Sequence, residues 1–195
     1  MEALRRHQWL AVTGTAAVVV AAALAAGCAS HSKRPKPVAI LRVSCDQSWV
    51  PTADTFKGFS GWRRTSVRIG PITLMGAKTG AAHRDVAAYG NIKFRTLVHP
   101  QTPVRVEIAP AARSAVGFVS PDDALREIWP KHGAPIMQLA GCPMNFLPYH
   151  GLRAIGYPMF LRIRHNACMP LTVRQTRTGR LARATVSIGA GRCRA

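Results

Sequence analysis

Short runs of alternating apolar and polar residues constrain the fold of this chain more than any other feature. Segment 104–108 has the sequence Val-Arg-Val-Glu-Ile, and segments 92–98 and 159–163 show the same period of two. This period is typical of a β-strand with one buried face. Gly and Pro residues lie between the runs and favour turns there. We therefore expect many short strands joined by turns.

The rest of the chain adds more candidate strands and little helix. Further strands are expected over 38–45, 66–69, 72–75, 115–119, 171–175 and 181–188. The last two flank Thr178-Gly179 and predict a hairpin. Such a chain predicts an all-β fold, a β-sandwich of about seven to nine short strands over residues 38–195.

One short helix is expected near residues 121–129. Ser120 has the residue type of an N-cap, Pro121 suits the first helical position, and Asp122 and Asp123 follow in the first turn. Pro130 ends the run.

Residues 1–27 have the pattern of an export signal. Arg5 and Arg6 precede an apolar run from Trp9 to Ala26, which leads through Gly27 to Cys28. This ending resembles a bacterial lipobox, in which the Cys receives a diacylglyceryl group and the chain is cut before it. We predict a lipoprotein anchored through Cys28 on the outer face of the cytoplasmic membrane, with residues 28–37 as a basic, Pro-bearing linker.

Three other interpretations of the apolar run stay open. Its 18 residues are enough for a short, uncleaved membrane anchor. An ordinary signal peptidase would instead release a secreted protein. A chance apolar helix in a cytosolic protein is the third interpretation. The distribution of positive charge does not decide how such an anchor would be oriented in the membrane. Arg5 and Arg6 precede the run, but Lys33, Arg34 and Lys36 follow it closely.

The cysteines support export. Cys28 as an anchor leaves Cys45, Cys142, Cys168 and Cys193, an even number suited to two disulfides in an oxidising compartment. Of the three possible connectivities we favour Cys45–Cys193, which joins the two ends of the domain, with Cys142–Cys168 in its second half. Buried free thiols are the alternative.

The chain is strongly basic, with a formal net charge of +19 and 21 Arg against 6 Lys. This charge favours a polyanionic partner such as an envelope polymer or anionic lipid. A compositional drift toward Arg, as in a GC-rich genome, is the alternative explanation. The basic residues are spread along the sequence and do not interleave with aromatics, which argues against a nucleic-acid site.

Two further segments hold candidate contact residues. The loop over 46–65 carries Trp49, Phe56, Phe59 and Trp62, which could contact a ligand or partner protein or could edge the core. The stretch 132–169 is rich in Met and His and carries a copper-binding alternative. Its candidate copper ligands are His132, Met137, Met144, His150, His165 and Met169. The same stretch holds Met159, which has the period of a core-facing residue, and Cys142 and Cys168, which could complete a soft site if both were reduced.

Neither segment predicts a catalyst or a resident cofactor. Met commonly fills gaps in cores, and no His pair in the copper candidate has the H-x-x-x-H spacing. The sequence has no G-x-S-x-G, H-E-x-x-H, P-loop or EF-hand motif. We therefore expect a non-catalytic domain without a cofactor.

The C-terminal part carries a resemblance to known proteins. Its features are the segments 156–161 and 167–173 and a closing Gly189-Ala190-Gly191-Arg192-Cys193. This pattern resembles a group of small exported actinobacterial proteins, often lipoproteins, that end in a strand followed by Gly-Ala-Gly-Arg-Cys. The resemblance implies a disulfide-bonded β-domain on the cell envelope and supplies no catalytic residues.

Overall fold

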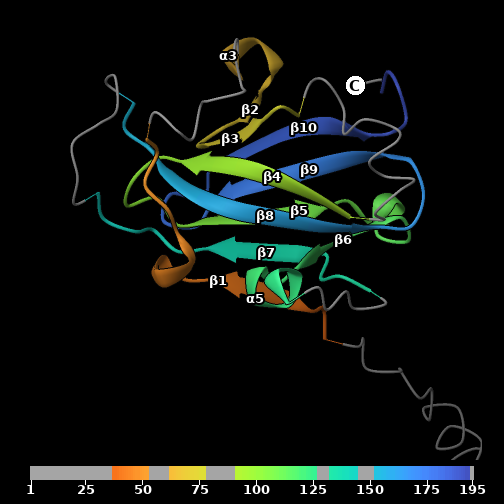
Figure 1. Cartoon of the computed structure of the whole chain (residues 1–195), viewed down its shortest axis with the longest axis horizontal. Helices are drawn as coiled ribbons and strands as arrows, with labels where there is room; N and C mark the ends of the chain where they lie inside the picture. Colours follow the sequence, from red (N-terminus) through yellow and green to blue (C-terminus); the bar gives the residue numbers. More distant parts are fainter. Residues whose placement is uncertain (1–36, 53–61, 78–90, 127–131, 145–151, 194–195) are drawn as a thin grey trace, which may run out of the picture. The chain divides into compact units, whose positions relative to one another are not determined.

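The structure is a computed structural model of the chain (Figure 1). It describes residues 37–52, 62–77, 91–126, 132–144 and 152–193. The chain divides at Pro37 into two units, and the fold below is that of the second, Val38–Ala195. The predicted signal and Cys28 lie outside the described residues. Within the described ranges, no helix is long and apolar enough to cross a membrane.

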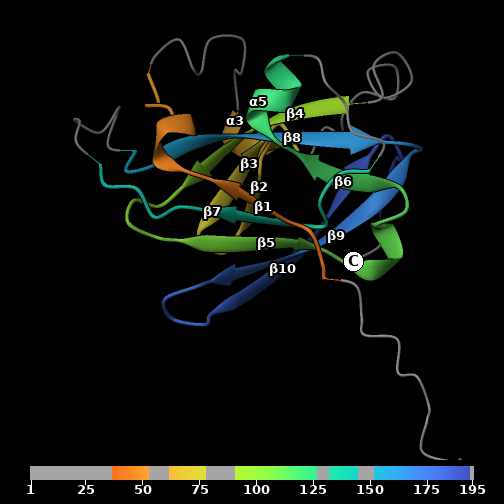
Figure 2. The same cartoon turned by 90° about the horizontal axis from the view of Figure 1, so that it is seen from below.

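The second unit is built from two five-stranded sheets. Sheet A has the order β1 (Ile40–Val43), β7 (Ile136–Leu139), β5 (Val104–Ile108), β9 (Ala167–Gln175) and β10 (Leu181–Ile188). Sheet B has the order β2 (Val67–Ile69), β3 (Ile72–Met75), β4 (Asn91–Val98), β8 (Ile155–Ile163) and β6 (Val116–Val119). Seen from below, β4 and β8 lie in one layer and β5 and β7 in the other (Figure 2). The predicted β-sandwich is confirmed, and the described residues form ten strands, where about seven to nine were expected.

Short helical turns connect the strands. They are η1 (Cys45–Gln47), α3 (Trp62–Thr65), η2 (Pro110–Ala112) and α5 (Pro121–Leu125). The helix start at α5 is as predicted, because the Ser120 hydroxyl accepts a hydrogen bond from the backbone N–H of Asp122 at 3.3 Å. The helix ends at Leu125, short of the predicted 129. A second short helix, α3, lies in what was predicted to be a loop.

The core fills the space between the sheets. In β5 the inward side chains of Val104, Val106 and Ile108 are fully buried, as their alternation predicts. From β8, Tyr157 and Leu161 project inward from the opposite sheet and are also fully buried. Complete burial of one such large side chain stabilises the fold by roughly 1.5–3 kcal/mol, so this interior fixes which face of each strand points out.

The sheets approach each other at both edges. Ala134, just before β7, exchanges two backbone hydrogen bonds of 2.8 Å with Phe118 in β6. Gly117 and Gly133 cross there so closely that a Cβ on either would lie within 2.6 Å of the other's backbone. At the other edge β2 and β10 make contact, although they are not hydrogen-bonded neighbours. Both edge strands of sheet B, β6 and β2, therefore touch sheet A.

The four predicted cysteines form two disulfides, but the favoured pairing was wrong. The bonds are Cys45–Cys142 and Cys168–Cys193, each with a Cα–Cα distance of 5.6 Å. They replace the expected Cys45–Cys193 and Cys142–Cys168.

The pairing of the strands explains why these cysteines are bonded to each other. Val43 at the end of β1 lies beside Leu139 at the end of the parallel strand β7, so Cys45 and Cys142 emerge together. In the β9–β10 hairpin, Ile188 lies opposite Ala167, next to Cys168. Gly189 and Gly191 then adopt positive φ angles of 64° and 72°, and the chain turns back to bring Cys193 to Cys168.

Candidate functional site: a basic groove and an arginine row

A groove of about 1020 Å³ opens where β2 and β10 meet. Its walls come from α3, β2, the β2–β3 turn, the end of β4, the segment before β8 and the β9–β10 hairpin. The described lining residues are Arg63, Ser66, Arg68, Gly70, Pro71, Thr73, Leu97, Val98, His99, Thr102, Leu152, Arg153, Ala154, Gln175, Arg180, Leu181 and Ala182. A space of this size is at the upper end of the range for small-molecule sites.

The groove is lined by basic side chains and, among its described lining residues, by no carboxylate. Arg63 comes from α3, Arg68 from β2, His99 from the end of β4, Arg153 from the segment before β8 and Arg180 from the hairpin. The fold therefore gathers basic side chains from five elements or segments of the chain. Charges of one sign in a concave surface raise the local concentration of the opposite charge, so the groove attracts anions.

Local hydrogen bonds shape part of the groove wall. The Nε–H of Arg68 donates to the carbonyl oxygen of Gly70 at 3.4 Å, which folds this side chain over the β2–β3 turn. Thr102 donates its hydroxyl to the carbonyl oxygen of Pro100 at 3.1 Å. Leu181 contributes an apolar patch at the rim, where 47% of its surface is exposed. The groove thus combines guanidinium groups with an apolar rim.

A second basic feature crosses the outer face of sheet A, and we call it the arginine row. The Cα pairing runs from Arg42 in β1 to Gln138 in β7, Arg105 in β5, Arg174 in β9 and Leu181 in β10. Neighbouring strands are about 4.8 Å apart, so the row is roughly 19 Å long. Leu181 belongs to both features, so the row ends at the rim of the groove.

The side chains of the row face away from the core. Their sequence neighbours Val43, Val104 and Val173 are buried, whereas Arg42 and Arg174 are exposed. Arg105 keeps 38% of its side chain exposed. Successive residues of a strand point to opposite faces, so these guanidinium groups project into solvent.

One carboxylate lies beside the row, but a different arginine holds it. Glu107 accepts a short bond from Nη2 of Arg113 at 2.7 Å, while its other oxygen lies 3.9 Å from Nη2 of Arg105. Arg113 is fixed in turn by an Nε–H bond of 3.0 Å to the carbonyl oxygen of Ile108. Glu107 therefore neutralises Arg105 only weakly.

The aromatic loop residues do not form an open contact surface in the described part of the chain. Trp49 packs on the outer face of sheet B against Met75, Leu97 and Ala154. Its indole lies so close to Gly156 that an added Cβ there would be 2.2 Å from the ring. Trp49 therefore edges a small core, which was the alternative interpretation. Phe56, Phe59 and the side chain of Trp62 lie outside what the structure describes.

The copper candidates are dispersed. Met137, Met159 and Met169 are buried in the core, Met144 packs against it, and His132 and His165 are exposed. Cys142 and Cys168 belong to different disulfides, so they offer no thiolate pair. His150 lies outside the described residues. Among the residues that the structure places, no group of three or more His, Cys, Asp or Glu side chains could hold a metal ion.

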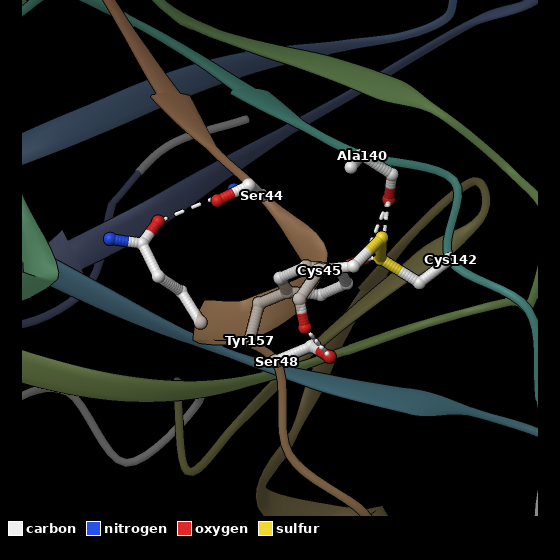
Figure 3. The surroundings of a disulfide bond; sticks show 7 residues. Ser44, Cys45, Ser48, Ala140, Cys142 and Tyr157 are labelled. Atoms are coloured by element: carbon white, nitrogen blue, oxygen red, sulfur yellow. Dashed lines mark hydrogen bonds between the residues drawn. A yellow bond between two sulfur atoms is a disulfide. The ribbon is translucent and has the colours of Figure 1, made fainter.

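The buried hydroxyl of Tyr157 joins the two sheets beside the Cys45–Cys142 disulfide (Figure 3). It donates to the carbonyl oxygen of Ala140 at 2.6 Å and lies 2.7 Å from Sγ of Cys142. Burial raises the pKa of this hydroxyl above the usual 10.0 of tyrosine. The group therefore stays protonated at ordinary pH and acts as a structural donor.

Sequence reasoning missed both basic features. The arginines were expected to stay dispersed, because no basic cluster occurs along the chain. The alternation did place Arg105 on the outer face of its strand, but the alignment with Arg42 and Arg174 depends on the order and register of four strands. The groove depends on contact between β2 and β10, which are about 110 residues apart in sequence.

Comparison of the chain with protein-family models, with curated proteins and with solved structures finds no significant match. The assignment of function therefore depends on the residues of this chain and their arrangement.

Proposed function

We propose that this chain is an exported lipoprotein whose β-sandwich domain binds an anionic polymer or lipid of the cell envelope without catalysing a reaction. The observation that carries the proposal is the groove, which four arginines line without a carboxylate among the described lining residues. Arginine presents a planar set of donors that matches phosphate and carboxylate groups, so such a groove suits an anionic ligand.

The anchor and the compartment are supported by the sequence. Cys28 follows a basic start and an apolar run, in the position that a lipobox requires. Both disulfides agree with an oxidising compartment, where such bonds persist. The resemblance to small exported actinobacterial proteins supports the same location on the outer face of the membrane.

The binding proposal is tested with the full chain in neutral phosphatidylcholine nanodiscs. Soluble anionic polymers are added and the dissociation constant is measured over a range of salt concentrations. We expect binding that weakens steeply with salt, because each phosphate contact that forms releases condensed counterions into solution. Binding that does not respond to salt, or no binding to any anionic polymer, would contradict the proposal.

A matched pair of variants locates the site. Arg68→Gln with Arg153→Gln removes two charges from the groove, and Arg126→Gln with Arg192→Gln removes two exposed charges elsewhere. The groove variant is expected to bind about tenfold more weakly or worse, because a hydrogen bond to a charged group contributes on the order of 1.5–3 kcal/mol. Equal losses in both variants would mean that only the net charge matters.

The anchor is tested by labelling with radioactive palmitate in a host that processes lipoproteins. The wild-type chain should take up label and Cys28→Ala should not. Label on the Cys28→Ala chain would exclude lipidation at this residue, and membrane retention without label would favour an uncleaved apolar span.

A further inference from the structure

The arginine row places like charges side by side across sheet A. Arg105 and Arg174 are direct partners in the antiparallel pair of β5 and β9, and Arg42 lies in the same row two strands away. Like charges directly opposite each other destabilise a sheet. A glutamine fills the remaining position between Arg42 and Arg105, so no carboxylate lies within the row. The arrangement makes sense if an anion covers the row.

The charge lies along a line rather than over the whole face. The adjacent row of partners consists of Ile40, Ile136, Glu107, Thr172 and Arg183. It holds one acidic and one basic residue, and Ile136 is buried. A flat anionic membrane would meet both rows, whereas a linear polymer needs only one. The pattern therefore favours a linear ligand.

The row is continuous with the groove. Arg174 pairs with Leu181, which borders the groove, and the backbone N–H of Gln175 donates to the carbonyl oxygen of Arg180 at 2.9 Å. Gln175 and Arg180 both line the groove. A chain-like ligand that leaves the groove over Leu181 would thus meet Arg174, Arg105 and Arg42 in succession.

We propose that the arginine row is a second subsite, in which a linear phosphate polymer crosses the strands of sheet A after its end is held in the groove. This inference rests on the proposed function of the groove and names the ligand class and its direction. Guanidinium groups bind phosphate oxygens in pairs, and repeated phosphates supply charge at regular intervals along a chain. The row contains no aromatic residue for stacking bases, so a nucleic acid is the less suitable phosphate polymer.

The test compares ligands of two lengths on three double variants of the full chain in neutral phosphatidylcholine nanodiscs. The ligands are tripolyphosphate and long-chain inorganic polyphosphate. The row variant is Arg105→Gln with Arg174→Gln, the groove variant is Arg68→Gln with Arg153→Gln, and the control is Arg126→Gln with Arg192→Gln. Each removes two charges, so differences between them report position.

The expected pattern depends on ligand length. The groove variant should bind both ligands about tenfold more weakly or worse. The row variant should lose about tenfold for the long polymer only and should bind tripolyphosphate within about twofold of wild type. For the long polymer, the slope of the logarithm of the binding constant against the logarithm of the salt concentration should also become shallower in this variant. The change should correspond to the loss of about one to two phosphate contacts.

Several results would overturn the inference. If the row variant binds the long polymer as tightly as the control does, the row is not a subsite. If the groove variant alone then binds more weakly than the control, the proposed function of the groove still stands. If neither variant differs from the control, both proposals fail. If polyglutamate, or single-stranded oligothymidylate, binds as tightly as long polyphosphate and responds equally to the row variant, the choice of a non-nucleic phosphate polymer is wrong. Circular dichroism and urea unfolding of each variant show that a loss of binding does not arise from unfolding.

Discussion

The two sheets share one core but differ in what lies on their outer faces. On sheet B, Trp49 covers Gly156, and α5 packs over β8, where Ala124 meets Phe160 (Figure 2). On sheet A, outward positions carry the arginine row, in which Arg42 and Arg174 are exposed. Apolar contacts therefore cover part of the outer face of sheet B, which also carries Arg68 and Lys93, whereas the arginine row presents guanidinium groups to solvent on sheet A.

This difference separates positions that maintain the fold from positions available for binding. An apolar cover adds burial, and burial stabilises the domain in proportion to the area removed from water. A row of like charges adds little apolar burial and works against the sheet through repulsion. We therefore expect substitutions in the apolar cover of sheet B to act mainly on stability and substitutions on the arginine row to act mainly on affinity.

The largest expected effect concerns the disulfide next to the covered face. Cys45–Cys142 fixes the segment that leaves sheet A and carries Trp49 over sheet B, and it spans 97 residues of sequence. Cys168–Cys193 spans 25 residues within sheet A. On the chain-entropy model, removing the first bond as a double Cys→Ala variant should cost about 4–5 kcal/mol in the free energy of unfolding, and removing the second about 3–4.

Urea unfolding measures these two losses, and hydrogen exchange locates them. Without Cys45–Cys142, the amide of Gly156, which donates to the carbonyl oxygen of Trp49 at 2.9 Å, should exchange faster relative to the rest of the domain. Without Cys168–Cys193, the relative protection of that amide should be retained. If the second variant proved the less stable of the two, or exposed Gly156 equally, the covered face would not depend on the first bond.

A smaller effect is expected where Trp49 meets Gly156. A Cβ at this position would lie 2.2 Å from the indole, so Gly156→Ala must displace the ring and should destabilise the domain by about 1–3 kcal/mol. With Trp49→Ala in place, the same substitution should cost much less, because the obstructing ring is gone. A double-mutant cycle in urea measures this coupling.

The position on sheet A that we compare with Gly156 is Gln138, in the middle of the arginine row. Gln138→Ala should change stability by less than about 0.5 kcal/mol, as is usual for surface substitutions. Additive effects of Gly156→Ala and Trp49→Ala, or a large loss with Gln138→Ala, would show that the two faces do not differ as their contacts indicate.

The alternation of side chains was sufficient to predict the sandwich and much of its core. In β5 and β9 it also indicated which residues point outward. It failed for β7, where three of the four residues Ile136–Leu139 are buried and no period of two is visible. Without β7, neither its parallel pairing with β1 nor the Cys45–Cys142 bond could be predicted.

Local sequence patterns do not predict which strands pair when the strands are far apart along the chain. The Cys168–Cys193 bond could have been predicted, because the β9–β10 hairpin was expected and its register places Ser187 opposite Cys168, six residues before Cys193. The arginine row was not, because its alignment requires the order of four strands that are separated along the chain. Local patterns determined which face each residue occupies, whereas packing of the whole core determined which residues became neighbours.

The smallest expected effect has the opposite sign and concerns Arg174. Arg174→Gln removes the like charge opposite Arg105 and leaves the weak contact of Arg105 with Glu107 in place. We expect the free energy of unfolding in urea at low salt to rise by about 0.5 kcal/mol. Added salt should screen the repulsion in the wild-type chain and remove most of the gain.

Affinity for long polyphosphate should fall in the same Arg174→Gln variant, so stability and binding would change in opposite directions, as is common where a binding site conflicts with the fold. Arg192→Gln, which removes an exposed arginine outside the row, should leave both quantities nearly unchanged. A loss of stability in Arg174→Gln would show that this arginine supports the sheet. The proposed difference between a stabilising face and a binding face would then not hold at Arg174, where the like charges lie directly opposite each other.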